Sequence, residues 1–425
     1  MRILIISHNA LSCDNNMGKT LLSQFAGCKN VEIAQLYTHE GTPDKTAFNV
    51  CSQYYSFSDI DALNSILRPW INGKNYTVPV RVENGNSLKH KVYKRSKGIK
   101  LIPFIVREFV WFLSNWKNKS LYTWIKRFSP DVIYLVPGAY PFIYKIAQRI
   151  SADLTIPIVV SIMDDYYFNN PLSTSGRLGR LCHHHFLKHA EKTLTSAKAI
   201  QLICEEAVQL FGSLNANCFS LYTTAEEKKL NFNASSKKIS YIGNISLGRW
   251  AQLVKLGKAL KHLNLNEGPR WIDVYTAETK QEYLQELTEE NGIKMHGKIS
   301  PAEVLMVMEN SMAVIHTESF DQPYRDMVRS SVSTKIAESL AYGPCLLAFG
   351  PSDVASIAHL KRNNAAYIID DESKLEEQLC QFINNKDLRR QLLDNARQTA
   401  TKYHNSSVNH EILVNIIQRS LSLLK

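Results

Sequence analysis

The sequence predicts an α/β protein built from two doubly wound domains. Short apolar runs alternate with segments of helical periodicity over most of the 425 residues, which is typical of parallel strands connected by helices. A polar stretch at 226–238 interrupts the alternation, which then begins again. A chain of this length also exceeds what one hydrophobic core ordinarily serves. We therefore expect one domain at 1–228, a second at 229–405 and a final helix at 406–425.

The first domain begins with a strand and continues as strand–helix units. Its first strand is wholly apolar, and Pro130 introduces a later apolar strand that Pro137 ends. The expected strands are 3–6, 31–37, 132–136, 158–163 and 199–204. The expected helices are 19–25, 141–150 and 205–211. This alternation predicts a parallel sheet.

The second domain repeats the pattern, and one unit within it is especially clear. Ile336, Ala337, Leu340 and Ala341 have helical spacing, Gly343 and Pro344 end that helix, and the apolar run 345–349 follows as a buried parallel strand. The expected strands are 238–242, 271–275, 293–296, 313–316, 345–349 and 366–369. Besides the helix that Gly343 ends, the expected helices are 250–263, 280–290, 301–309, 354–361, 374–383, 388–402 and 408–424.

The net charge of +11 is concentrated in one segment. Residues 89–127 carry 11 Lys and Arg residues and one acid, Glu108, which gives this segment a charge of +10. Trp116 and Trp124 lie among these cations, and a basic segment that carries tryptophan favours anionic lipid headgroups. We expect residues 89–127 to bind an anionic membrane surface. The alternative is a domain helix with a basic outer face; no nucleic-acid motif accompanies the segment, so no nucleic-acid partner is expected.

Other features exclude several classes of protein. None of the eight cysteines forms a Cys-x-x-Cys pair, so neither a zinc knuckle nor a disulfide framework is supported. Of the histidines at 183–185 and 189, only His185 and His189 share a helix face, which argues for a solvated helix and against a metal site. The apolar run at the amino terminus is too short for a signal peptide, and no run reaches the ~18 residues of a membrane span. We expect a cytoplasmic protein, peripheral at the inner face of the cytoplasmic membrane.

The start of the helix that Gly343 ends carries residues suited to a nucleotide. Ser333 and Thr334 supply hydroxyls and free amides at a helix amino terminus, which is a natural anion site. Lys335 adds a charge that suits phosphate. Glu338, one turn further on, can accept hydrogen bonds from two hydroxyls of a ribose. The alternative is an ordinary αβ unit with a capped helix.

This block resembles the donor-binding segment of retaining GT-B glycosyltransferases, in particular glycosyltransferase family four. In that family the helix ends in a Glu-x-x-Ala-x-Gly-x-Pro-like pattern, which here reads Glu338, Ala341 and Gly343, with Pro344 one place early. The family often carries a second glutamate eight residues before the first, where this chain has Ser330. The resemblance implies the GT-B fold: two Rossmann-like domains facing a cleft, with the C-terminal helix crossing back to the first domain. It also implies that Glu338 holds the ribose.

The loop that opens the second domain looks like the start of a GT-B donor domain. In that family a glycine loop leads to an arginine and then a lysine, which together neutralise the diphosphate leaving group. Here the loop contains Asn244, and the pair would be Arg249 and Lys255. Arginine suits this task because its planar fork grips phosphate oxygens and stays charged. The alternative is that Arg249 is a surface residue at a helix start.

Further candidates follow the strands at their carboxyl ends, where parallel sheets bind ligands. His316 and Glu318 are expected at the donor sugar, with a loop hydrogen-bond pair as the alternative. Gly18 follows the first strand and suits the glycine that faces the donor phosphates or the acceptor in GT-B enzymes. Asp164 and Asp165 stand where many relatives have a His-Asp dyad, and we expect them to orient the acceptor. Helix capping is the alternative for both aspartates.

Together these residues predict a retaining glycosyltransferase of the hexosyl type. It would move a sugar from a nucleotide diphosphate sugar, such as a UDP sugar, to a hydroxyl of a lipid-linked glycan in capsule, exopolysaccharide or other surface polysaccharide biosynthesis. Neither a cofactor nor a metal is expected. One alternative is a nucleotide-dependent epimerase or oxidoreductase, although the first strand lacks a following Gly-x-Gly-x-x-Gly. The other is a non-catalytic, membrane-associated partner of a glycan assembly complex, which Ser330 favours.

Overall fold

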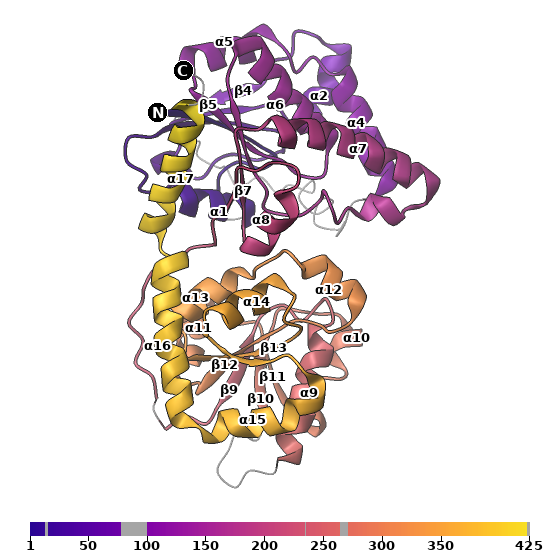
Figure 1. Cartoon of the computed structure of the whole chain (residues 1–425). Coiled ribbons are helices and arrows are strands. Elements are labelled where there is room, and N and C mark those ends of the chain that lie inside the picture. Colours follow the sequence, from indigo (N-terminus) through magenta and orange to yellow (C-terminus); the bar gives the residue numbers. More distant parts are fainter. Residues whose placement is uncertain (13–15, 78–99, 234, 264–270, 423–425) are drawn as a thin grey trace. The chain divides into compact units, whose positions relative to one another are not determined.

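The computed structural model describes residues 1–12, 16–77, 100–233, 235–263 and 271–422. The chain divides into two compact units (Figure 1). Unit 1 comprises Met1–Leu221 and Asn409–Lys425, and unit 2 comprises Tyr222–Val408. The boundaries predicted at 228 and 405 lie a few residues from these positions. Both units are α/β, which confirms the predicted fold class.

Within the described residues, the sheet of unit 1 has eight strands in the order β4-β3-β2-β1-β5-β6-β7-β8. Neighbouring strands are parallel, apart from the antiparallel pair of β3 and β4. The strands are β1 (Arg2–Ser7), β2 (Glu32–Tyr37), β3 (Gln53–Ser56), β4 (Lys74–Tyr76), β5 (Val132–Val136), β6 (Ile158–Ser161), β7 (Ala199–Leu202) and β8 (Cys218–Ser220). The helices are α1 (Asn16–Phe25), α2 (Asp59–Leu67), α4 (Leu101–Leu113), α5 (Lys119–Phe128), α6 (Pro141–Leu154), α7 (Gly176–Ser196), α8 (Glu205–Phe211) and α17 (Ser406–Ser422).

The sheet of unit 2 is parallel throughout its described part, with six strands in the order β11-β10-β9-β12-β13-β14. The strands are β9 (Ile239–Ile242), β10 (Ile272–Tyr275), β11 (Ile293–Gly297), β12 (Ala313–Thr317), β13 (Cys345–Phe349) and β14 (Tyr367–Ile369). The helices are α9 (Arg249–His262), α10 (Gln281–Leu284), α11 (Pro301–Glu309), α12 (Gln322–Val328), α13 (Thr334–Tyr342), α14 (Ala355–Arg362), α15 (Leu375–Asn384) and α16 (Lys386–Tyr403). Because β9 pairs with β10 on one side and β12 on the other, the strand order reverses there, and α/β sheets bind ligands at such a switch point.

Helix α13 has the apolar face that its sequence predicted. Ile336, Ala337, Leu340 and Ala341 are all buried, and Ile336 and Leu340 join the core that contains Leu346 of β13. Burial of this stripe leaves Glu338 on the exposed side of the helix, whereas Ser339 is buried. The polar residues at the start of α13 are thereby held at the carboxyl edge of the sheet.

The last helix returns to unit 1, as the predicted fold requires. Leu413 and Ile417 of α17 are buried in the core that β1, β2 and β5 form with α1. The His410 ring also lies 3.0 Å, at Nε2, from the carbonyl oxygen of Ser23 in α1. Figure 1 shows α17 in yellow beside the elements of unit 1.

Some elements differ from the sequence expectations. In place of the helix predicted at 280–290, the structure has the short helix α10 and a separate 3-10 turn. Thr288 caps the start of that turn, and Gly292 ends it with a left-handed backbone, at φ +73°. The sequence analysis missed β3, β4 and α12, which are short and partly polar. It also missed α2, although Ser58 and Asp61 form a capping box at its start, a signal that is readable in the sequence.

Candidate functional site

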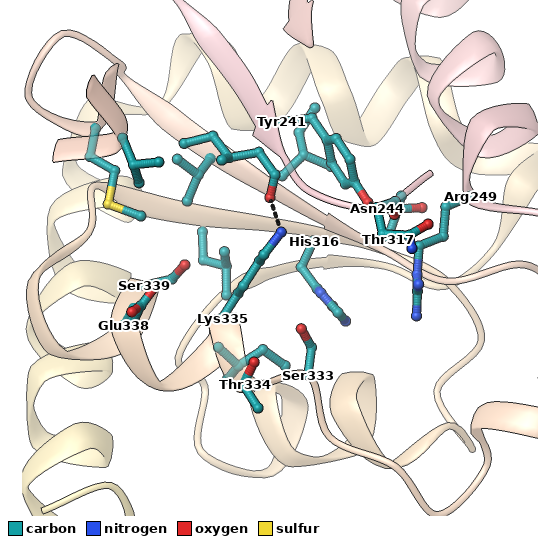
Figure 2. A pocket seen from close by; sticks show the side chains of 17 residues that line it. Tyr241, Asn244, Arg249, His316, Thr317, Ser333, Thr334, Lys335, Glu338 and Ser339 are labelled. Atoms are coloured by element: carbon teal, nitrogen blue, oxygen red, sulfur yellow. Dashed lines mark hydrogen bonds between the residues drawn. The ribbon is translucent and has the colours of Figure 1, made fainter. Parts of the chain in front are cut away.

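A cavity of about 220 Å³ lies in unit 2 at the end of β9 and β12 (Figure 2). This is the switch point of the sheet. Its polar lining consists of Asn244, Arg249, His316, Thr317, Ser333, Thr334, Lys335, Glu338 and Ser339. Its apolar lining consists of Tyr241, Ile242, Val304, Met308, Val314, Ile315, Ile336 and Leu346. All of the polar residues except Thr317 and Ser339 were predicted as donor-binding residues.

The loop between β9 and α9 forms one wall of the cavity, and Gly248 permits the path of its backbone. Gly248 has φ +74°, and a Cβ there would lie 2.7 Å from the Oγ of Ser319, so neither the backbone nor the space suits a larger residue. The side chain of Asn244 accepts a hydrogen bond from the backbone N–H of Ser246 at 2.7 Å. The hydroxyl of Tyr241 donates to the carbonyl of Asn244 at 2.6 Å. Asn244 therefore shapes the loop as well as lining the cavity.

Arg249 begins α9 and forms a two-pronged ion pair with Glu318, which follows β12. Its Nε donates to one carboxylate oxygen and its Nη2 to the other, both at 2.9 Å. The Glu318 side chain is 3% exposed and that of Arg249 is 17% exposed. Burial raises the pKa of Glu318, and the charge of Arg249 partly offsets this rise. The switch point thus brings Glu318 together with Arg249 and leaves Glu318 outside the lining of the cavity. Its contact with the donor sugar stays a prediction.

Lys335 reaches from α13 across the end of β9. Its Nζ donates to the carbonyl oxygen of Ile242 at 2.9 Å, the contact drawn as a dashed line in Figure 2. A Cβ at Gly243 would lie 2.7 Å from that Nζ, so the glycine makes room for the ammonium group. The protein surroundings desolvate this group and lower the pKa of Lys335.

His316 lies between the two cationic side chains in Figure 2. Its Nε2 is 2.9 Å from the Oγ of Ser356 and 3.6 Å from Oε1 of Glu318. Burial, together with the charges of Arg249 and Lys335, lowers its pKa to about 3. The ring is therefore neutral at physiological pH and can donate or accept one hydrogen bond at each nitrogen according to its tautomer.

The amino terminus of α13 closes the cavity. Ser333 is its N-cap residue and Thr334 its first residue, and the Ser333 side chain makes no cap hydrogen bond within the described structure. The first amides of a helix lack internal acceptors and attract anions. Glu338 lines the same cavity one turn further on. Two cations, a neutral imidazole and free amides thus surround a space suited to a phosphate-bearing ligand.

Lys255 does not line this cavity. It pairs with Glu372 in a separate, solvent-exposed depression that also contains His262 and Glu376. Six residues of helix place it roughly 9 Å further along α9 than Arg249. The cavity therefore gives no support to its predicted place beside the diphosphate. Gly18 lies in α1 of unit 1 and is not part of the lining.

The two aspartates that follow β6 of unit 1 differ in their surroundings. Both carboxylate oxygens of Asp165 accept hydrogen bonds, from the backbone N–H of Phe168 at 2.9 Å and from Nδ2 of Asn169 at 3.0 Å. Asp165 therefore closes a turn and caps no described helix, since Asn170 is the N-cap of the next helical turn at 171–174. Asp164 makes no side-chain hydrogen bond in the described residues, and desolvation raises its pKa. Of the pair, Asp164 is the one available for a ligand.

His8 was missed although it directly follows the first strand. Its Nδ1 lies 3.0 Å from Oγ1 of Thr38, while its buried Nε2 has no hydrogen-bond partner among the described residues. A Cβ at Gly138 would lie 2.8 Å from its ring, so the loop after β5 packs tightly on it. Burial lowers the pKa of His8 well below its usual range. The position of His8 at a strand end was the signal that could have identified it.

Two general features concern metals and membranes. Within the described ranges, no three His, Cys, Asp or Glu side chains gather closely enough to hold a metal ion. In the same ranges, no helix is both long and apolar enough to span a membrane.

Comparison with known proteins agrees with the geometry of unit 2. The glycosyl transferase-like family matches residues 254–414, whereas no curated protein sequence matches the chain. The structure of HepE from Anabaena in complex with UDP is similar over 99% of this chain and 100% of its own, at a TM-score of 0.62 and 12% identity. Sucrose-phosphate synthase from Thermosynechococcus elongatus aligns over 99% of both chains, at a TM-score of 0.57 and 9% identity. TarM from S. aureus, in a complex that contains UDP, covers 98% of this chain and 99% of its own, at a TM-score of 0.57 and 9% identity.

These similarities concern the fold over the whole chain and the family over its second half. Full-length alignment with glycosyltransferases of GT-B architecture confirms the predicted fold, and the family match supports the predicted enzyme class, a transferase. The chain thus has the GT-B fold, and its residues 254–414 match the glycosyl transferase-like family.

Proposed function

We propose that the protein is a retaining glycosyltransferase that takes a sugar from a nucleoside diphosphate sugar and transfers it to a hydroxyl of a lipid-linked glycan. UDP is the nucleotide we favour, because HepE and TarM are similar in fold and their structures are complexes with UDP. Surface polysaccharide biosynthesis is the process that such an acceptor would serve.

One observation carries the proposal. Arg249, which two hydrogen bonds hold to Glu318, lines the same cavity as Lys335 and the amino terminus of α13. Glu318 occupies Nε and one N–H of Nη2, which leaves the remaining guanidinium N–H groups for a ligand. A rigid, partly buried arginine beside free helix amides suits a diphosphate better than it suits a neutral ligand.

In the proposed reaction, Arg249 and Lys335 act on the negative charge of the leaving group. When the sugar–phosphate bond breaks, negative charge grows on the leaving diphosphate, and Arg249 and Lys335 stand ready to stabilise it. This stabilisation costs little reorganisation, because Glu318 and the Ile242 carbonyl already fix both cations. The two side chains supply the positive charge, so the proposal requires no metal. Glu338 would accept hydrogen bonds from the ribose hydroxyls.

Unit 1 would supply the residue that orients the acceptor. Asp164 has a carboxylate without a hydrogen-bond partner in the described structure and follows a strand of the parallel sheet. We assign to it the orientation of the acceptor hydroxyl. In a retaining reaction without a protein nucleophile, the departing phosphate takes the proton of that hydroxyl, so Asp164 would orient the acceptor and form no covalent intermediate.

The lipid-linked acceptor implies work at a membrane surface. The basic segment 89–127 is the part of the sequence that favours anionic lipid, although residues 89–99 lie outside the described structure. We propose a peripheral attachment at the cytoplasmic face of the membrane.

Thermal unfolding in the presence of UDP, GDP, ADP, CMP, NAD and ATP tests the donor site first. We expect one nucleoside diphosphate to raise Tm selectively, and the corresponding nucleotide sugar to be turned over with release of that diphosphate. Stabilisation by NAD or ATP alone would contradict the proposal. Binding of a nucleoside diphosphate without turnover, for every acceptor tried, would favour the non-catalytic partner instead.

A further inference from the structure

Helix α4 presents a row of large apolar side chains to solvent. Ile102, Val106, Phe109, Phe112 and Leu113 are all exposed, and Phe112 reaches 75% exposure. Their spacing of three and four residues places them on one side of the helix. Phe104 and Trp111, on the other side, are buried. A contiguous exposed apolar face of this kind marks an interaction surface.

The inner side of α4 fixes the helix firmly to unit 1. The Nε atom of Arg107 donates to Asp59 of α2 at 2.8 Å, and the indole N–H of Trp111 donates to the same carboxylate oxygen at 2.7 Å. Trp111 also stacks on Phe142 of α6, with ring centroids 4.3 Å apart. The guanidinium of Arg107 lies 4.3 Å from the ring centre of Tyr140. The apolar row therefore belongs to an anchored helix and is not the result of a loosely attached one.

Helix α7 extends the apolar surface across a groove. Leu178 and Leu181 near its start are exposed, Leu181 by 67%. An open groove of about 640 Å³ lies between the two helices, lined on the α4 side by Phe109 and Phe112 and on the α7 side by Leu181 and Cys182. Figure 1 shows α4 and α7 near one another in unit 1.

Polar side chains also line this groove. Nζ of Lys145, in α6, lies 3.0 Å from Nε2 of His185 and 3.7 Å from a carboxylate oxygen of Glu108. The solvated helix predicted for the histidines is therefore only partly correct: His185 and His189 line the groove, because they lie one turn apart on the side of α7 that faces it.

Exposed basic residues accompany the apolar residues of α7. Residues 176–189 of α7 contain Arg177, Arg180 and Lys188, all exposed, and no acid. In the sequence, residues 89–100 contain six Lys and Arg residues and no acid directly before α4. An apolar face with a basic border is complementary to a bilayer that carries anionic headgroups.

We propose that α4 and the first half of α7 together form the surface that docks on an anionic phospholipid membrane. Phe109, Phe112 and Leu181 enter the acyl region, while Arg177 and Arg180 contact headgroup phosphates. The proposal rests on the membrane attachment in the proposed function and deepens it. It assigns half of the docking surface to α7, which lies outside the basic segment 89–127.

Flotation with vesicles of phosphatidylglycerol and phosphatidylcholine tests this surface on the full-length protein. We expect the wild type to bind these vesicles and to bind phosphatidylcholine alone far more weakly. Phe109→Ser/Phe112→Ser and Arg177→Glu/Arg180→Glu should each reduce binding roughly tenfold or more. The matched control is Met327→Ser/Arg390→Glu, which changes an apolar side chain as exposed as Phe109 and an exposed arginine of unit 2, and should bind as the wild type does.

Light scattering and thermal stabilisation by UDP, on the same samples, test the alternatives to a membrane-docking surface. Light scattering reports the oligomeric state, and a wild-type dimer that Phe109→Ser/Phe112→Ser dissociates would overturn the proposal in favour of a contact between copies. Wild-type binding that the α7 variant leaves unchanged would overturn the role of α7. Thermal stabilisation by UDP reports unit 2 separately: failure of vesicle binding with intact UDP binding overturns the docking surface alone, whereas failure of UDP binding concerns the donor site alone.

Discussion

Glu318 holds the guanidinium of Arg249 with both carboxylate oxygens, at 2.9 Å each, although 69 residues separate the two in the chain. The contact joins the end of β12 to the start of α9 at the point where the sheet reverses its strand order. Removing one partner leaves the other in a site from which water is largely excluded. Such a loss costs more than the pair itself contributes to stability.

The first prediction concerns stability and its pH dependence in Arg249→Ala. We expect the free energy of unfolding to fall by about 3 kcal/mol near neutral pH, because the buried Glu318 carboxylate loses its cation. Without Arg249 the raised pKa of Glu318 rises further, so the folded state binds more protons than the unfolded state above about pH 4. The deficit relative to the wild type should therefore shrink as pH falls towards that value and grow as pH rises.

Urea unfolding at a series of pH values measures this deficit. Lys255→Ala is the control, because its exposed pair with Glu372 should contribute less than about 1 kcal/mol. A deficit for Arg249→Ala that does not change with pH would contradict the assignment to Glu318.

The second prediction separates charge from geometry at the same position. Arg249→Lys keeps the positive charge but loses the planar fork that reaches Glu318 and a phosphate together. We expect kcat to fall roughly 100-fold, which corresponds to the loss of one preorganised donor at the leaving group. A coupled assay for release of the nucleoside diphosphate measures kcat. Turnover equal to that of the wild type would remove Arg249 from the reaction.

The third prediction addresses the ribose contact. Glu338→Ala should weaken nucleoside diphosphate binding by about 2 kcal/mol, roughly 30-fold, because two ribose hydroxyls lose their acceptor. Titration calorimetry measures the change in Kd, and Glu411→Ala, an exposed glutamate of α17, serves as the matched control. Equal affinity in both variants would place the nucleotide elsewhere.

Local sequence signals predicted the helix and the strand within 333–349 well, because these elements depend on neighbouring residues. The apolar stripe of α13, its polar start and the buried strand β13 all follow from spacing within 333–349. The ion pair between Glu318 and Arg249 could not be predicted in the same way. It depends on β9 and β12 being neighbours in the sheet, and the sequence alone does not specify which strands are neighbours. The exposed row on α4 likewise depends on which side of the helix packs against α2 and α6.

The fourth prediction concerns His316. Its pKa is about 3 in the folded protein, against 6.5 for an exposed histidine, so the unfolded state binds more protons between these values. The resulting stability is fully present above about pH 6.5 and is lost as pH falls. His316→Gln lacks this dependence, and its stability relative to the wild type should improve by about 1.4 kcal/mol for each pH unit below about 6. Unfolding of both proteins across this range measures the difference, with the exposed His262→Gln as control; parallel curves for His316→Gln and the wild type would show that His316 is not held neutral.

The fifth prediction separates the neighbouring carboxylates of unit 1. Asp165 accepts hydrogen bonds from Phe168 and Asn169, so Asp165→Asn should lower the free energy of unfolding by about 1 kcal/mol and leave turnover per folded molecule nearly unchanged. Asp164 makes no such contact and burial raises its pKa, so Asp164→Asn should not lower the free energy of unfolding. It should raise KM for the acceptor or lower kcat by about tenfold or more. Neither change should affect thermal stabilisation by UDP, because both residues lie in unit 1 and the nucleotide cavity lies in unit 2. A loss of turnover in Asp165→Asn with full activity in Asp164→Asn would reverse the two roles, and the acceptor would then have to displace the turn contacts of Asp165.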